Sequence, residues 1–140
     1  MSFLFGTRSY GNLYGNGVLK HMVHPFLQEL CLRTIRKCPV DFTIIQGWRS
    51  DEAQNEAYEA GNSKLKGGRS NHNKTPSRAV DFSPYPIDFT DIPKYLVIVN
   101  EFKKEAVLMG LPIICGADWV MRDYGHIELP NNAEISLEMV

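Results

Sequence analysis

Four side chains whose types can bind a metal or carry a proton stand near the ends of expected strands. They are His72, Asp81, Asp123 and His126. Two imidazoles with one carboxylate form a common protein shell for catalytic zinc and leave a fourth position for water. A second carboxylate outside that shell can act as the general base. Each residue taken singly also fits a solvated loop, strand-edge or turn position, and the spacing lacks the specificity of a paired CxxC signature.

Two motifs contain these four residues. The first is Ser70-Asn71-His72, followed after a spacer by Ser77-Arg78-Ala79-Val80-Asp81. The second is Gly116-Ala117-Asp118-Trp119, followed by Asp123-Tyr124-Gly125-His126-Ile127-Glu128-Leu129. Other parts of the chain carry further short motifs, namely Val23-His24-Pro25, the segment from Pro39 to Thr43, Gly47-Trp48-Arg49-Ser50 continuing to Gln54, and Gly110-Leu111-Pro112-Ile113.

Together these motifs resemble a family of zinc peptidases. The family includes D-alanyl-D-alanine carboxypeptidases and bacteriophage L-alanyl-D-glutamate endopeptidases. Its signatures are Ser-x-His followed by Gly-x-Ala-x-Asp, and Gly-Asp-Trp followed by Asp-x-x-His and an acidic residue. The resemblance extends over about residues 10 to 130 in the family's order, which chance agreement around one site would not produce.

The chain departs from the family pattern at three points. Ser77 stands where the family has glycine, and Ala117 adds a methyl group to a Gly-Gly-Asp-Trp pattern. The spacer between His72 and Asp81 is also two positions longer than usual. A longer loop could bulge outward without moving either ligand, so the sequence leaves the geometry of this spacer open.

The resemblance implies that His72, Asp81 and His126 hold one zinc ion and that Asp123 is the general base. It also implies that Arg49 faces the substrate. This arginine either stabilises the negative charge that grows on the carbonyl oxygen or binds a substrate carboxylate. Supporting or substrate-contacting positions are expected for four further residues, Ser70, Asp118, Trp119 and Glu128.

The position of Glu128 follows from strand geometry. Period-two alternation places His126 and Glu128 on one face of their strand and Ile127 and Leu129 on the other. Glu128 therefore either orients a ligand or replaces Asp81 as a ligand. We favour the first because Asp81 occupies the family's ligand position.

Apolar periodicity and turn residues predict the elements that must position these groups. Helices are expected over 24–37, 51–60 and 92–109, with His21 and His24 at the start of the first. Strands are expected over 41–46, 78–82, 111–114 and 125–129, a long loop over 62–77 and an irregular arm over 1–18. This order favours an α+β fold with a small, mainly antiparallel sheet and helices packed on one side.

The length, charge and composition of the chain limit the classes of function that it can have. A length of 140 residues is typical of a single domain, so residues 1–140 are expected to form one peptidase domain. The net charge of -1 argues against a nucleic-acid partner, and no apolar run approaches the length of a membrane span. The start of the chain lacks the features of a signal peptide. Cys31, Cys38 and Cys115 are expected to be buried free thiols.

The resemblance therefore predicts a zinc metallopeptidase that hydrolyses the stem peptides of bacterial peptidoglycan. We expect an L-alanyl-D-glutamate endopeptidase that acts as a monomeric phage endolysin in host cell lysis. Such an enzyme would stay in the host cytoplasm until a holin gives it access to the cell wall. The alternatives are a D-alanyl-D-alanine carboxypeptidase and, from another class, a catalytically silent zinc- or wall-binding module.

Overall fold

The computed structural model describes residues 22–61 and 70–130. The expected arm over 1–18, His21 and the first part of the expected loop over 62–77 lie outside these residues. The described helices are α2 (Pro25–Lys37), α3 (Asp51–Glu59) and α4 (Ile92–Met109), and the strands are β1 (Phe42–Gln46), β2 (Ala79–Pro84), β3 (Ile114–Cys115) and β4 (His126–Glu128). Two short 3₁₀ turns, η1 (Asn71–Asn73) and η2 (Gly116–Asp118), lie between them.

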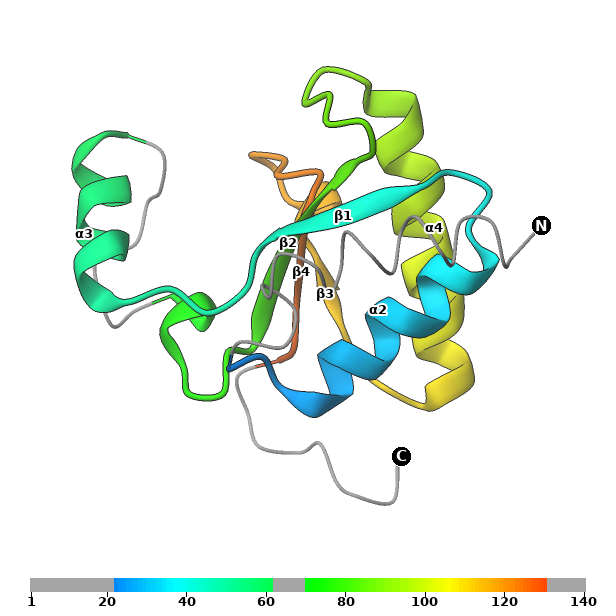
Figure 1. Cartoon of the computed structure of the whole chain (residues 1–140), viewed down its shortest axis with the longest axis horizontal. Coiled ribbons are helices and arrows are strands. Elements are labelled where there is room, and N and C mark those ends of the chain that lie inside the picture. Colours follow the sequence, from blue (N-terminus) through cyan, green and yellow to red (C-terminus); the bar gives the residue numbers. More distant parts are fainter. Residues whose placement is uncertain (1–21, 62–69, 131–140) are drawn as a thin grey trace.

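The four strands form one antiparallel sheet in the order β1-β2-β4-β3. Helices α2 and α4 pack against each other and share one hydrophobic core with the sheet (Figure 1). Helix α3 lies apart from them, beyond the end of β1 (Figure 1). The predicted α+β class is confirmed, and α2 and α4 are the helices that pack on one side of the sheet.

Strand alternation separates the core from the opposite face of the sheet. Val80, Phe82 and Ile127 are almost completely buried in the core. The Phe82 ring contacts the rings of Phe42 and Phe102, with centroids 5.7 and 5.2 Å away. Because neighbouring residues of a strand point to opposite faces, the side chains between these apolar residues project away from α2 and α4.

The bounds of two strands differ from the sequence prediction by two residues or more. The strand predicted over 111–114 is wrong, because β3 comprises Ile114–Cys115. The N–H of Leu111 bonds back to the last turn of α4, and Pro112 has no N–H to donate to a sheet. Strand β2 continues to Pro84, past its predicted end, because β1 also pairs with its last residues.

The helix ends agree with the sequence signals. His24 caps α2, since its Nδ1 accepts a hydrogen bond from the Phe26 N–H at 3.0 Å. Ser50 caps α3 in the same manner, and α4 ends at Gly110, whose positive φ of 67° favours glycine. The three cysteines are free and buried, as expected. No helix among the described residues is long and apolar enough to cross a membrane.

Truncation of Phe82 should test how strongly this core supports the sheet. Phe82 is 1% exposed, so we expect Phe82→Ala to lower the free energy of unfolding by about 3–5 kcal/mol. The matched control is Phe89→Ala, because Phe89 is 65% exposed and should change stability by less than about 0.5 kcal/mol. Urea denaturation measures the free energy of unfolding of both variants. Equal losses in the two variants would contradict the packing described here.

Candidate metal centre

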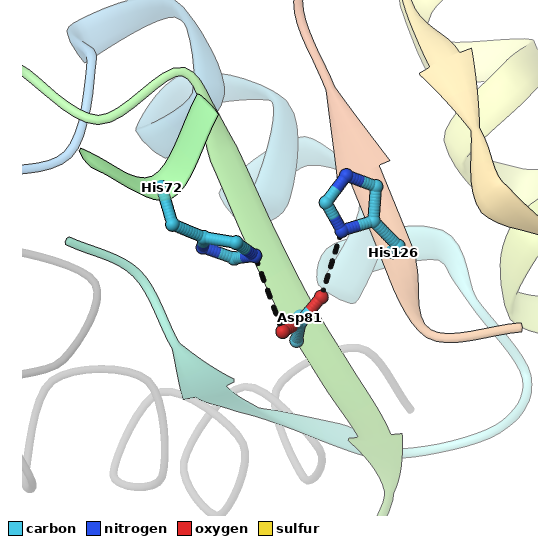
Figure 2. Close-up of side chains that lie close together, drawn as sticks. All are labelled: His72, Asp81 and His126. Carbon is cyan, nitrogen blue, oxygen red and sulfur yellow. Dashed lines mark hydrogen bonds and ion pairs between the residues drawn. The ribbon is translucent and has the colours of Figure 1, made fainter. Parts of the chain in front are cut away.

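Three segments bring His72, Asp81 and His126 together on the face of the sheet opposite the core (Figure 2). Asp81 in β2 and His126 in β4 are direct partners across the two strands. His72 lies in η1, next to the start of β2. The two oxygens of Asp81 face different histidines, with Oδ1 3.0 Å from Nδ1 of His126 and Oδ2 3.2 Å from Nε2 of His72. One candidate ligand atom from each residue lies within 4.8 Å of the others.

The outer nitrogen of each histidine ring has its own hydrogen-bond acceptor. Nδ1 of His72 lies 2.8 Å from the carbonyl oxygen of Gly47. Nε2 of His126 lies 2.7 Å from Oε1 of Glu128. Since these oxygens accept hydrogen bonds, each outer nitrogen carries a proton, and a neutral ring has its lone pair on the nitrogen that faces Asp81. Such outer contacts typically orient histidines that bind metal.

The charges of the site suit a cation. Burial alone lowers the pKa of His126, but the hydrogen bonds to Asp81 and Glu128 outweigh it and raise the pKa to about 9. Burial alone raises the pKa of Asp81, but hydrogen bonds from His126 and His72 keep this pKa well below its usual value. At neutral pH the site without metal therefore contains an ionised Asp81 held by a protonated His126.

Ser70 shapes the turn that carries His72. Ser70 is buried, and its hydroxyl accepts a hydrogen bond from the His72 N–H at 3.1 Å. The Asn73 side chain completes the cap by accepting from the Ser70 N–H at 3.1 Å. The same Asn73 amide donates to the carbonyl oxygen of Arg49 at 2.8 Å. Ser70 thus fixes the backbone of the turn, and Asn73 ties the turn to the segment after β1.

The longer spacer between His72 and Asp81 runs over the surface. Its middle, residues 74–76, is exposed. Ser77 is completely buried where the chain returns, and its N–H and carbonyl bond to Met22 and His24 at 2.6 and 2.9 Å. The extra residues therefore leave the contact between His72 and Asp81 intact.

Asp123 lies beside the cluster without belonging to it. A Cβ on Gly116 would lie only 2.3 Å from the Asp123 carbonyl oxygen and 2.9 Å from Cβ of His126, so glycine permits this close approach. Partial burial and the negative charge of Asp81 raise the pKa of Asp123 above its usual value, and both histidines oppose this shift. The carboxylate of Asp123 is thus near enough to the candidate ligands for their charges to shift its pKa.

Arg49 also faces the cluster. Its Nη2 lies 3.7 Å from Oδ2 of Asp81, and its Nη1 donates a hydrogen bond to Oε1 of Gln54 at 2.7 Å. Gln54 is the buried residue of α3. The backbone N–H of Arg49 donates to the His72 carbonyl oxygen at 2.9 Å. Side chain and backbone contacts therefore fix the guanidinium beside a candidate ligand.

The remaining predicted residues lie in different surroundings. Trp119 is 37% exposed, and its ring lies 5.0 Å from that of His126, measured between centroids. Glu128 contacts His126 directly, as the alternation predicted. Asp118 instead forms an ion pair with Lys103 of α4, where both carboxylate oxygens lie 3.0 Å from Nζ. The structure therefore brings Trp119 and Glu128 to the ligands and joins Asp118 to a helix.

Sequence reasoning assigned no role to three groups that support the site. They are the carbonyl of Gly47, the side chain of Asn71, which contacts Glu128, and the side chain of Gln54. A backbone carbonyl has no signature in sequence, and the contact of Asn71 with Glu128 joins residues 57 positions apart. Gln54 lies only five positions from Arg49, but no spacing rule predicts their contact. The only available signal was their position inside the motifs.

Known proteins are similar to this chain in both sequence and fold. A family model described as phage L-alanyl-D-glutamate peptidase matches residues 1–132. The L-alanyl-D-glutamate peptidase of Escherichia phage T5 is 31% identical over 144 residues, which cover 92% of this chain and 99% of the phage T5 protein. The crystal structure of the Serratia marcescens L-Ala D-Glu endopeptidase ChiX matches with a TM-score of 0.73 and 28% identity, over 88% of this chain and 86% of ChiX. The chain therefore belongs to the phage L-alanyl-D-glutamate peptidase family.

Proposed function

We propose that this chain is a zinc-dependent peptidoglycan endopeptidase that cleaves the bond between L-alanine and D-glutamate in stem peptides. The observation that carries the proposal is the meeting of His72, Asp81 and His126 with their outer ring nitrogens already bonded. Family membership supplies the substrate, since the matched relatives are named for this bond.

The donor set fits zinc. Two histidine nitrogens and one carboxylate oxygen are the ligand types of a catalytic zinc site with an open position. We assign Nε2 of His72, Nδ1 of His126 and the Asp81 carboxylate as the ligand atoms. Zinc bound in such a site supplies Lewis acidity, which lowers the pKa of water to about 7 and polarises a carbonyl group.

Asp123 is the general base in this proposal. Its carboxylate lies near the ligands but outside the cluster, so it remains free to accept a proton from the attacking water. The same oxygen then donates that proton to the amine that leaves when the peptide bond breaks. The raised pKa of Asp123 supports this second task, because a more basic carboxylate holds the proton between the two steps.

Arg49 stabilises the negative charge that develops on the carbonyl oxygen of the scissile bond. Its guanidinium is held at 2.7 Å by Gln54 and lies 3.7 Å from Asp81, so the positive charge is fixed next to the metal ligands before substrate arrives. A donor that is already oriented contributes most to such stabilisation. This position favours the carbonyl oxygen over a distant substrate carboxylate as its partner.

The proposal extends to the biological setting. We propose that the protein acts as a monomeric endolysin which reaches the wall from the host cytoplasm after a holin opens the membrane. The match to an L-alanyl-D-glutamate peptidase of a phage supports a role in phage infection. The complete set of ligands, base and arginine argues against a catalytically silent binding module.

Digestion of purified peptidoglycan tests the function. We expect new D-glutamate amines among the products, measured by mass spectrometry, and no product in the presence of a chelator. Cleavage should return when zinc is added after the chelator is removed. Loss of a single alanine would instead identify a carboxypeptidase, and intact stem peptides with zinc present would contradict both enzymes.

Zinc binding tests the ligand set. We expect about one zinc per chain, and its loss in His72→Ala and His126→Ala. The control is His24→Ala, because His24 caps α2 and should leave zinc content unchanged.

The pH dependence of zinc affinity gives a second test of the same ligands. Zinc must displace a proton from His126, whose pKa is raised to about 9, so affinity should rise with pH by about tenfold per unit below that value. Competition with a chromogenic chelator between about pH 6 and pH 8 measures the slope. An affinity independent of pH would show that His126 is not a ligand.

Replacement of Asp123 separates chemistry from metal binding. Asp123→Ala should keep its zinc and its fold but lose the proton-transfer contribution, on the order of 10²-fold or more in cleavage rate. Zinc content and stem-peptide cleavage are measured on one preparation. The control is Asp88→Ala, an exposed aspartate before α4 that should retain full activity. Near-normal cleavage by Asp123→Ala would rule out this base, and loss of zinc would make Asp123 a ligand.

A further inference from the structure

Two hydrogen bonds link His126 through Glu128 to Asn71, the residue that precedes His72 in the chain. Nε2 of His126 bonds to Oε1 of Glu128 at 2.7 Å. The other oxygen of the same carboxylate, Oε2, accepts a hydrogen bond from Nδ2 of Asn71 at 3.0 Å. Asn71 is the residue before His72 in the turn η1. The side chain of Asn71 in η1 thus contacts the carboxylate of Glu128, which orients His126 in β4.

The surroundings of Asn71 hold its amide in this position. Asn71 is 8% exposed. Its backbone carbonyl accepts a hydrogen bond from the Arg78 N–H at 2.9 Å, which fixes η1 against the segment that enters β2. Ala79 of β2 is in turn the cross-strand partner of Glu128. The backbone therefore places the Asn71 amide beside Glu128.

The Asn71 amide restricts the orientation of the Glu128 carboxylate. A glutamate side chain has three rotatable bonds, and the contact with His126 alone would occupy one of its two oxygens. With Oε2 bound to Asn71, Oε1 is directed at Nε2 of His126. Because that contact keeps a proton on Nε2, the lone pair of the neutral ring stays on Nδ1, which faces Asp81.

We propose that Asn71 is a positioning residue that sets the metal affinity of the centre by fixing Glu128 against His126. The inference rests on the zinc site proposed above and goes beyond it. In the family signature Ser-x-His, Asn71 occupies the position that is left open. Metal affinity is thus tuned from a position that the signature does not specify, through a contact between residues 57 positions apart in the chain.

The expected effect is a loss of zinc affinity with little change in the ligands themselves. Removal of a group that orients a ligand typically weakens metal binding by about 10–100-fold. Glu128→Ala should therefore weaken zinc binding by about 10–100-fold, and Asn71→Ala should weaken it by a measurable factor no larger than this. Since Asn71 acts through Glu128, it should have no further effect once Glu128 is replaced.

A double-mutant cycle read by zinc affinity tests this inference. Competition with a chromogenic chelator gives the zinc affinity of the unmodified chain, Asn71→Ala, Glu128→Ala and the double variant. We expect both single variants to bind more weakly and the double variant to match Glu128→Ala alone. Lys74→Ala, an exposed change in the same loop, serves as the control and should bind as the unmodified chain does. If Asn71→Ala fails to fold, Asn71→Leu replaces it in the cycle, because leucine is close to asparagine in size, lacks the donor and adds no charge beside Glu128.

The outcomes distinguish this inference from the proposed function. If Asn71→Ala binds zinc as tightly as the unmodified chain does, the role of Asn71 is overturned, but the proposed zinc site is not. Additive losses in the double variant would also overturn it, because they would show that Asn71 acts independently of Glu128. Failure of the unmodified chain to bind zinc more tightly than His72→Ala would overturn the zinc site itself, and the inference with it.

Discussion

The pairing register between β2 and β4 is the constraint on which the candidate site depends. It places Asp81 opposite His126 on one face and Val80 opposite Ile127 on the other. Because side chains alternate along a strand, a slip of one residue would move the apolar side chains out of the core and the ligands into it. The burial of Val80 and Ile127 therefore holds the carboxylate and the imidazole together. One face of this strand pair therefore builds the core, and the other carries two residues of the candidate metal centre.

Residues from two loops complete the candidate site on the sheet. The turn η1 delivers His72 over the start of β2, and the segment after β1 supplies both Arg49 and the carbonyl that orients His72. These contacts leave an ionised Asp81 between two imidazoles, one of them held by a second carboxylate from Glu128. Without metal, this arrangement retains a proton on His126 that a cation of suitable size can replace. The protein thus assembles the charge and the orientation of the ligands before any substrate binds.

Sequence patterns predicted the parts of this structure that depend on local rules. Apolar periodicity, caps and glycine stops located the helices, and strand alternation placed Glu128 beside His126. The ligand set and base came from motif resemblance, since two histidines and two aspartates alone left several assignments open. The ion pair of Asp118 with Lys103 and the contact of Asn71 with Glu128 could not be foreseen, because each joins residues whose proximity depends on the finished fold. The separation of α3 from the sheet likewise has no local signature.

In the proposed zinc site, the outer hydrogen bonds select one nitrogen of each histidine as the metal ligand. Nitrogen-15 NMR of the histidine side chains in the zinc-loaded protein tests this most directly, because a ring nitrogen that binds metal differs in chemical shift from one that carries a proton. We expect zinc on Nε2 of His72 and on Nδ1 of His126, with protons on Nδ1 and Nε2 respectively. Zinc on the opposite nitrogen of either ring, or spectra unchanged by zinc, would contradict the account.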